Sequence, residues 1–273
     1  MSASLLRNRS RRATYLCYHS IAAEGPTYLT VSPELFERQL RELARLGVAT
    51  GGLAELEAVA AGRNGPPTAF LTFDDGFLDN FTTVLPLLRE HRARAFVFVL
   101  PPLLGEGGVF AWPEVAADRE RFPTTMRSVT WDQLGEMAEG GFEVGSHTLS
   151  HRHLPDLHGE ELRQELADSR ALIRARLGSC DTLAYPFGEW SAEVAAAAAE
   201  CGYSFAFTLP TAVGQRGAGE CSIPRINVDY RDDEGRFGRK LSPVGKEVFL
   251  SPQVATVRRL VRRVRGKPAP GTV

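Results

Sequence analysis

Long hydrophobic runs are missing from this sequence. Nowhere in its 273 residues do about 18 apolar residues follow one another, so we expect no transmembrane helix. The first twelve residues are basic, with arginines at positions 7, 9, 11 and 12, but the apolar stretch that follows ends after residue 18. A run of that length is too short for the core of a secretion signal. We therefore expect a cytoplasmic protein with a basic N-terminal tail at residues 1–12.

The sequence also contains few cysteines and has almost no net charge. The four cysteines stand far apart and form no C-x-x-C pair, so we expect them to be reduced. The 32 basic and 33 acidic residues give a net charge of −1. Such a balance creates no general field that would attract nucleic acid, and any electrostatic recognition must come from local groups. We predict no nucleic-acid partner.

What the chain does contain is a regular alternation of strand and helix patterns. Apolar runs typical of buried strands occur at 14–18, 71–73, 95–100, 142–145, 181–185, 203–208 and 223–228, with helical spacing between most of them. This alternation predicts an α/β fold with a parallel sheet, and the number of strands favours a distorted, closed (β/α) barrel of about seven strands. We expect one domain at residues 13–250, with a Pro- and Gly-rich insertion at 101–128.

Two carboxylates stand side by side where one of these strands ends, in the stretch Leu71-Thr72-Phe73-Asp74-Asp75-Gly76. Successive side chains on a strand point to opposite faces, so the two acids can share a site only if the chain turns there, and Gly76 supplies that turn. Like charges this close persist most easily when a cation lies between them or one of them is protonated. A solvated Asp-Asp-Gly loop is the alternative.

A pair of histidines follows another strand. His147 and His151 are four residues apart, which would place them on the same side of one helical turn, a spacing that can hold one metal ion. Local polarity is the alternative, because a third histidine comes two residues later. Two histidines and one carboxylate make a catalytic metal site with open positions. Functional groups gather at the C-terminal ends of barrel strands, so we expect a single site there formed by His19, Asp74, Asp75, His147 and residues 185–187.

Catalysis at such a site needs a general base and a general acid that protonates the leaving group. A metal-bound carboxylate accepts protons poorly, so one acid would bind the metal and the other would remain free as general base. Histidine is the usual general acid near neutral pH. His91 lies late in a surface helix and His158 precedes one, which leaves His19 and His153. We prefer His19 because it ends a strand.

The motifs Thr72–Gly76 and Ser146–His151, about 70 residues apart, together resemble the first two signature motifs of the polysaccharide deacetylase family. Its members are metal-dependent amide hydrolases that act on N-acetylated sugars, and the resemblance extends from about residue 19 to 229. It implies that Asp74 is the general base. It also implies a divalent metal ion, most often Zn²⁺, bound by Asp75, His147 and His151.

The segment Leu183–Gly188 resembles the third motif of the family, with Ala184 at the position of the usual arginine. In the family the backbone N–H of the aromatic residue, here Phe187, helps to stabilise the oxyanion. The arginine usually orients the base, and Arg225 is our candidate to replace it. Tyr185, Phe187, Trp190 and Trp131 could stack on sugar rings, with packing in the core as the alternative.

The usual C-terminal Leu-x-His motif, which provides the general acid in the family, is absent, since no histidine follows His158. The run Tyr15–His19 resembles that element placed at the N-terminus. Circularly permuted family members, including deacetylases of β-1,6-linked poly-N-acetylglucosamine, have this arrangement and also lack the arginine of the third motif. The resemblance therefore implies that His19 is the general acid.

Residues 251–273 carry a basic amphipathic pattern. Val257–Arg265 sets apolar residues at 257, 260, 261 and 264 against five arginines. This pattern predicts a helix that rests on an anionic membrane surface, which would suit a lipid-linked sugar as substrate, or one that docks on the barrel.

We thus predict a metal-dependent deacetylase acting on an N-acetylated polysaccharide or lipid-linked glycan. Two alternatives remain. The same site could hydrolyse O-acetyl esters of sugars, or the protein could be a non-catalytic carbohydrate-binding relative.

Overall fold

The computed structural model describes residues 12–210, 219–251 and 253–254. Its main sheet is parallel throughout and follows the order β10-β9-β8-β7-β6-β5-β1-β11. The strands are β1 (Ala13–Tyr18), β5 (Thr68–Phe73), β6 (Ala95–Val99), β7 (Phe142–Ser146), β8 (Thr182–Ala184), β9 (Phe205–Thr208), β10 (Ile223–Pro224) and β11 (Ile226–Asn227). Short strand β4 (Ala49–Thr50) pairs with β5, and β2 (Ser20–Ile21) pairs with β3 (Thr30–Val31) outside the main sheet.

One segment brings the two ends of the sheet together. In residues 223–227, β10 pairs with β9 while β11 pairs with β1, and only Arg225 separates the two short strands. A single expected strand at 223–228 is therefore two, each paired with a different neighbour. Counting this segment once, the strands occupy seven positions around a nearly closed barrel. The predicted (β/α) barrel is confirmed.

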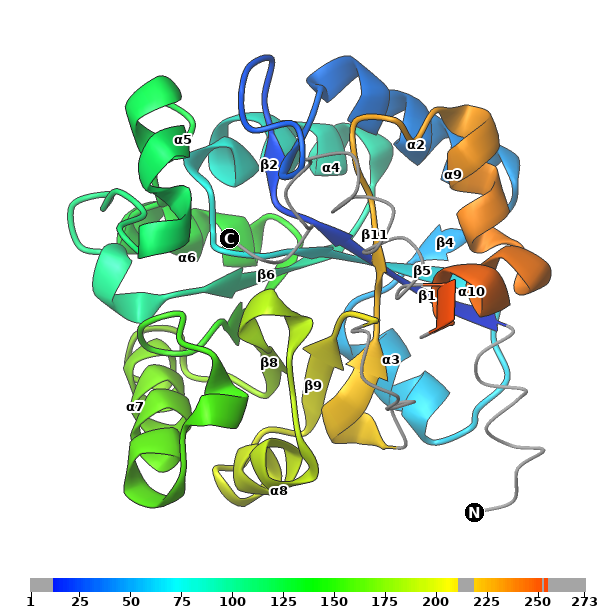
Figure 1. The fold of residues 1–273 in the computed structure, drawn as a ribbon. Coiled ribbons are helices and arrows are strands. Elements are labelled where there is room, and N and C mark those ends of the chain that lie inside the picture. Colours follow the sequence, from blue (N-terminus) through cyan, green and yellow to red (C-terminus); the bar gives the residue numbers. More distant parts are fainter. Residues whose placement is uncertain (1–11, 211–218, 252, 255–273) are drawn as a thin grey trace.

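Helices surround the strands in Figure 1. They are α2 (Pro33–Arg45), α3 (Leu53–Ala60), α4 (Leu85–His91), α5 (Ala116–Arg121), α6 (Trp131–Glu139), α7 (Gly159–Leu177), α8 (Ala192–Glu200), α9 (Glu234–Leu241) and α10 (Pro243–Phe249), with a π-helical turn at Asn80–Val84. The expected end groups are present: Ser32 caps α2, and Thr130 and Gln133 form the capping box of α6. The insertion at 101–128 contains α5 and is only partly irregular.

Aromatic rings fill the inside of the barrel. Tyr15 of β1 lies 5.9 Å from Phe207 of β9, and Phe96 of β6 lies 6.0 Å from the same ring, although neither strand pairs with β9. These contacts therefore run across the interior. Because side chains alternate along a strand, the residues two or four positions beyond such rings point the same way. Asp74, four residues after buried Phe70, is therefore directed into the mouth of the barrel.

Strand register brings the C-terminal ends to one level. Tyr18 pairs with Phe73 at the ends of β1 and β5, and Val99 pairs with Ser146 at the ends of β6 and β7. His19, Asp74 and His147 are the next residues of their chains. Parallel pairing thus places these polar side chains together just above the aromatic layer.

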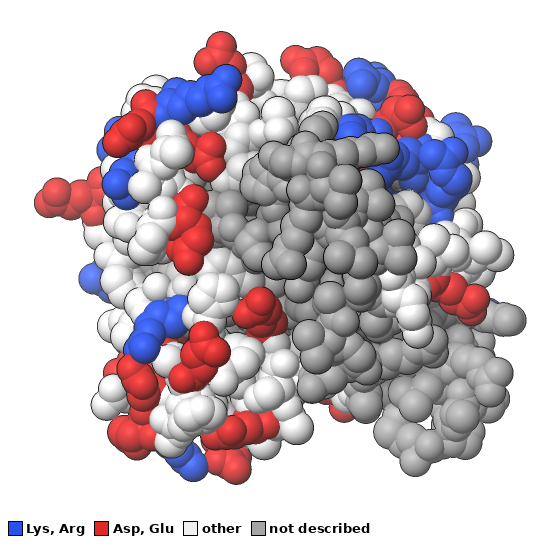
Figure 2. Space-filling view, in the orientation of Figure 1, with Lys and Arg blue, Asp and Glu red and all other residues white. Residues whose placement is uncertain are grey.

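The four cysteines are free in the structure, as expected. No helix in the described part of the chain is long and apolar enough to cross a membrane. Acidic and basic side chains are interspersed over much of the face shown in Figure 2. The basic segment Val257–Arg265 lies outside the described residues, so its membrane contact stays a prediction.

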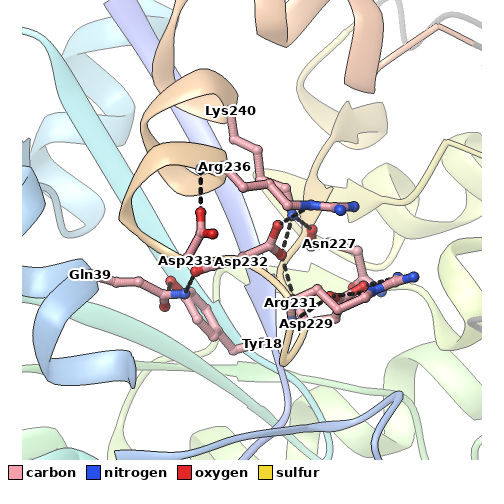
Figure 3. A network of polar contacts seen from close by, with 9 residues as sticks. All are labelled: Tyr18, Gln39, Asn227, Asp229, Arg231, Asp232, Asp233, Arg236 and Lys240. Carbon is pink, nitrogen blue, oxygen red and sulfur yellow. Dashed lines mark hydrogen bonds and ion pairs between the residues drawn. The ribbon is translucent and has the colours of Figure 1, made fainter. Parts of the chain in front are cut away.

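A buried polar network joins the closing segment to α2 and α9 (Figure 3). Lys240 of α9 donates to the carboxylate of Asp232 and to the carbonyl of Asn227, and the Asp232 side chain also pairs with Arg236 at 2.8 Å. Gln39 of α2 then links Asp232 to β1, because it donates to the Asp232 carbonyl (2.8 Å) and accepts from the hydroxyl of Tyr18 (2.9 Å).

Removal of Asp232 should destabilise the protein strongly, since buried Lys240 would lose its counter-ion. We expect Asp232→Ala to lower the free energy of unfolding by about 3–5 kcal/mol in urea titrations. The matched control is Glu234→Ala, which breaks the exposed 2.8 Å pair with Arg38 and should cost less than about 1 kcal/mol. Equal losses in the two variants would contradict a structural role for the network.

Candidate metal centre and active site

The polar residues at the strand ends line one narrow pocket. His19 follows β1, Asp74 and Asp75 follow β5, and His147 follows β7. All of them contribute to its wall, together with His151, Phe187 and Asn227. The structure therefore brings His19, Asp74, Asp75 and His147 together, whereas of the expected residues 185–187 only Phe187 lines the pocket.

Asp75 reaches this pocket because the backbone turns at that residue. Asp75 itself has φ 70°, as does Gly76, so both adopt the left-handed conformation. A Cβ atom on Gly76 would lie 2.8 Å from Cγ1 of Val99, which explains the need for glycine there. The turn that was expected at Gly76 alone thus involves the second carboxylate as well, and it directs Asp74 and Asp75 to the same site.

His147 and His151 approach each other through a loop, and the expected helical turn is wrong. Thr148 and His151 have φ 71° and 58°, which no helix allows. The imidazole rings nevertheless lie with centroids 5.0 Å apart. Nδ1 of His147 lies 2.8 Å from the carbonyl oxygen of Ala184, so Nδ1 carries the proton and Nε2 is left as a free ligand atom.

Glu165 of α7 holds this loop, a role that was not predicted from the sequence. Its buried carboxylate accepts hydrogen bonds from the backbone N–H groups of Leu149 and Ser150, both at 3.0 Å, and from the Ser150 hydroxyl. The signal that could have identified it is a carboxylate on the apolar face of a helix. By accepting three hydrogen bonds, this one carboxylate fixes a loop that lacks regular structure.

The cluster Asp75, His147 and His151 fits a metal ion. Oδ1 of Asp75 lies 3.4 Å from Nε2 of His147 and 3.5 Å from Nε2 of His151. Two donors about 2.0–2.1 Å from a tetrahedral Zn²⁺ would be about 3.3–3.4 Å apart, so the spacing matches. All three side chains are buried, and Oδ1 of Asp75 has no hydrogen-bond partner among the described residues.

The electrostatics of the cluster agree with a cation. Burial, together with the nearby Asp74, raises the pKa of Asp75 well above its ordinary value, which means that its charge lacks compensation from the protein. Burial lowers the pKa values of His147 and His151, so both rings are neutral and able to bind a metal. A divalent cation would supply the compensation that Asp75 lacks.

Asp74 is held by a different partner. Burial alone would raise its pKa, but the Arg225 guanidinium holds that pKa well below the ordinary range. Arg225 donates from Nη1 to Oδ1 (2.6 Å) and from Nη2 to Oδ2 (2.7 Å), a bidentate pair in which both residues are buried. The expectation that Arg225 stands in for the absent arginine of the third motif agrees with this contact. Cys17 also approaches Asp74, with Sγ 3.5 Å from Oδ2.

The two histidines considered as general acid, His19 and His153, lie in different surroundings. A ring nitrogen of His19 lies within 4.8 Å of an Asp74 carboxylate oxygen, and burial lowers the pKa of His19 to about 4. His153 lies farther out, where it stacks on the Phe187 ring with centroids 3.9 Å apart and contacts Glu189 at 2.8 Å. His19 is therefore the histidine placed beside the free carboxylate.

The aromatic residues of the third motif divide between site and core. Phe187, with φ 58°, lines the pocket, and its ring meets the edge of His151. Tyr185 is fully buried in the main core and donates its hydroxyl to the carbonyl of Cys221 (2.9 Å), so it does not line the pocket and does not face a substrate. Trp190 packs against the main core at its margin, as Trp131 does, and neither belongs to the pocket wall.

Two segments that the sequence did not assign to the site close over it. Tyr28 and Leu29 come from the loop after β2, and Trp112 and Val115 come from the insertion. The Trp112 indole stacks on His151 with centroids 4.3 Å apart. A hydrogen bond from the Tyr28 hydroxyl to Asp118 ties the two segments together. A Trp within a Pro- and Gly-rich insertion was the available signal.

Replacing Arg225 by methionine should leave Asp74 as a buried charge without its partner. We expect Arg225→Met to lower the free energy of unfolding by about 3–5 kcal/mol at pH 7. In the wild type the Asp74 pKa is depressed, so its stabilisation is present above the unfolded pKa of about 4 and is lost as the pH falls below it. In the variant burial raises that pKa, so acidification neutralises the unpaired charge.

The deficit of Arg225→Met should therefore shrink between pH 7 and about pH 4 in urea titrations. The control is Arg94→Met, which removes a half-exposed pair with Glu143 and should cost less than about 1 kcal/mol at either pH. A deficit for Arg225→Met that does not change with pH would show that Asp74 is not the group involved.

Comparison with known proteins gives a consistent result. A polysaccharide deacetylase family model matches residues 61–206. The provisionally named polysaccharide deacetylase YxkH of Bacillus subtilis (strain 168) is 25% identical over 240 residues, 87% of this chain and 78% of that protein. A chitooligosaccharide deacetylase of Sinorhizobium fredii is 30% identical over 150 residues, 54% of this chain and 59% of that protein.

Among solved structures, Streptococcus pyogenes deacetylase PplD in complex with acetate has a TM-score of 0.71 at 22% identity and covers 85% of this chain and 98% of its own, which shows a shared fold. The family match spans more than half of the sequence and includes Asp74, Asp75, His147 and His151, whereas His19 and Arg225 lie outside it. The chain belongs to the polysaccharide deacetylase family.

Proposed function

We propose that this protein is a divalent-metal-dependent N-deacetylase of N-acetylated glycans. The observation that carries the proposal is the pair of adjacent carboxylates in opposite surroundings. Asp75 lies against His147 and His151 with an unsatisfied oxygen, while Asp74 is paired with Arg225 and remains free of the cluster. A non-catalytic carbohydrate-binding protein would gain nothing from burying a carboxylate charge beside two neutral imidazoles.

The metal would be held by Asp75, His147 and His151, and Zn²⁺ suits two imidazoles and a carboxylate. When bound, the cation supplies Lewis-acid polarisation of the acetyl carbonyl and eases deprotonation of water. Asp74 would take a proton from the attacking water. The backbone N–H of Phe187 would donate to the oxyanion that forms on the acetyl group.

His19 would protonate the departing amine. With a pKa of about 4 its ring is neutral near pH 7, so it must first receive the proton that it donates. Asp74, whose carboxylate lies within 4.8 Å of a ring nitrogen, can return the proton taken from water. The water proton thus passes to Asp74, then to His19 and finally to the amine nitrogen as the C–N bond breaks.

The substrate class is supported by similarity to a chitooligosaccharide deacetylase, which favours a β-linked N-acetylglucosamine glycan. Whether it is a polymer or a lipid-linked sugar inside the cell depends on the location of the protein, and we propose the cytoplasm with contact to a membrane through the basic segment at 257–265. Acetate release from N-acetylated glycans, compared with O-acetylated sugars and with metal analysis of the same preparation, separates the amide hydrolase from the esterase. A protein that binds glycan but releases no acetate would be the non-catalytic relative.

The two neighbouring carboxylates should behave differently when neutralised. Asp74→Asn should retain the metal and lose about 10²–10⁴-fold in kcat for acetate release, because it removes the base. Asp75→Asn should lose both metal and activity, because it removes a ligand. Metal content after gel filtration and acetate release are the measurements. Retained activity in either variant would contradict the assignment.

His19→Ala removes the proposed general acid. It should lower kcat by about 10²–10⁴-fold and leave the metal content unchanged. The comparison variant is His153→Ala, which removes an imidazole at the margin of the pocket and should retain most of the turnover. Near-normal turnover in His19→Ala together with a large loss in His153→Ala would transfer the acid role to His153.

A further inference from the structure

The segment His19–Ile21 is held by hydrogen bonds to two residues that follow Asp74 and Asp75 in the sequence. After β1 the chain leaves the barrel through His19 and enters β2 at Ser20. The side chains of Asp79 and Asn80, four and five residues after Asp75, contact this segment. Neither residue lines the pocket, and neither has a part in the chemistry proposed above.

Asp79 accepts two hydrogen bonds from the exit segment. The Ser20 hydroxyl donates to Oδ2 at 2.7 Å, and the backbone N–H of Ile21 donates to Oδ1 at 2.8 Å. Ser20 and Ile21 are fully buried and Asp79 nearly so. Burial raises the pKa of Asp79 to about 6, so near pH 7 it is an ionised acceptor that satisfies both donors. Charge-assisted hydrogen bonds of this kind are among the stronger ones in proteins.

Asn80 fixes His19 itself. Its Nδ2 donates to the backbone carbonyl of His19 at 2.9 Å and to Oδ1 of Asp79 at 3.1 Å. Both neighbours are acceptors, so the amide can take only the orientation that places its nitrogen toward them. Asn80 holds the carbonyl of His19 and Asp79 holds the next two residues, so these two side chains restrain the backbone at His19, together with the bond from the Ser20 N–H to the Leu29 carbonyl.

The geometry of this region is unusual in a way that suits such a role. Asn80 begins a π-helical turn at Asn80–Val84 directly ahead of α4, and π-helical turns are frequent at functional sites. The short segment at 74–80 therefore carries Asp74, Asp75 and the two side chains that bind the backbone around His19. A displacement of this segment would move base, metal ligand and acid together.

We propose that Asp79 and Asn80 are positioning residues that set the His19 imidazole for proton transfer to the leaving amine. The inference rests on the proposed function in which His19 is the general acid. It goes beyond that function because it assigns the placement of the acid to the segment that follows the base.

Leaving-group dependence separates this role from a general structural one. An N-acetylated glycan loses an amine and needs an acid, whereas an aryl acetate ester loses a phenolate and does not. Asn80→Ala should lose about 10–100-fold in kcat on an N-acetylated chitooligosaccharide, because a misplaced group can cost about 10²-fold, and less than about twofold on an aryl acetate. Metal content should not change. Equal losses on both substrates would overturn the proposal.

Two further variants keep this test sharp. Ser20→Ala is a small change at a buried position that removes one donor to Asp79, and it should show the same selective loss in smaller size even if Asn80→Ala folds poorly. Thr82→Ala lies on the same π-helical turn, but the Thr82 side chain is exposed and its hydroxyl donates to the Leu78 carbonyl at 3.5 Å. It should match the wild type on both substrates.

A double-mutant cycle tests whether Asn80 acts through His19. In a His19→Ala background, Asn80→Ala should cause no further loss on the amide substrate, because the group that it positions is gone. An independent, full additional loss in the double variant would show that Asn80 acts by another route and would overturn the proposal.

One measurement does not depend on turnover and therefore separates this inference from the proposed function. In the full-length protein with histidines labelled by ¹³C, Asn80→Ala should shift or broaden the ring signals of His19 and leave those of His153 unchanged. If wild type releases no acetate but this response is seen, the proposed function fails, whereas the placement of the His19 ring by Asn80 still holds. If wild type is active and the His19 signals do not change, the positioning role fails alone.

Discussion

The buried ion pair between Arg225 and Asp74 is the interaction on which the rest of the structure depends. Arg225 lies in the segment that closes the barrel, between the short strand paired with β9 and the one paired with β1. Its side chain crosses the interior beside Phe98 and Phe207 to reach the end of β5. A fully buried guanidinium would be very costly alone, so closure of the barrel and the state of Asp74 are linked in one contact.

That contact also separates two carboxylates that are adjacent in sequence. Arg225 keeps Asp74 ionised, whereas the burial of Asp75 raises its pKa and leaves an oxygen without a partner. Neighbouring titratable groups whose surroundings drive their pKa values apart are the usual sign of divided roles in a catalytic site. The division follows from position: Asp74 continues the inward alternation of β5, while Asp75 is turned by its left-handed backbone toward the two histidines.

Buried polar side chains outside the pocket then hold its irregular loops. Glu165 holds the loop of His147 and His151, and Asp79 and Asn80 hold the exit from β1. Each satisfies backbone donors or acceptors that no strand or helix could pair. A site built from loops gains its geometry from such supports, because loops alone do not fix side chains closely enough for catalysis.

Much of this was readable from the sequence because it depends on local patterns. Alternating apolar runs and helical spacing predict the barrel, and a strand followed by Asp74-Asp75-Gly76 or by His147 places those residues at C-terminal ends. Contacts between distant residues needed the tertiary structure. The closing segment splits in two because β9 and β1 each require a partner. Tyr185 is buried in the main core, where its hydroxyl bonds the Cys221 carbonyl, and the loop at 147–151 is shaped by Glu165 from the following helix. Spacing along the chain determined which groups could meet, and long-range packing decided which ones do, because only folding sets their burial and their partners.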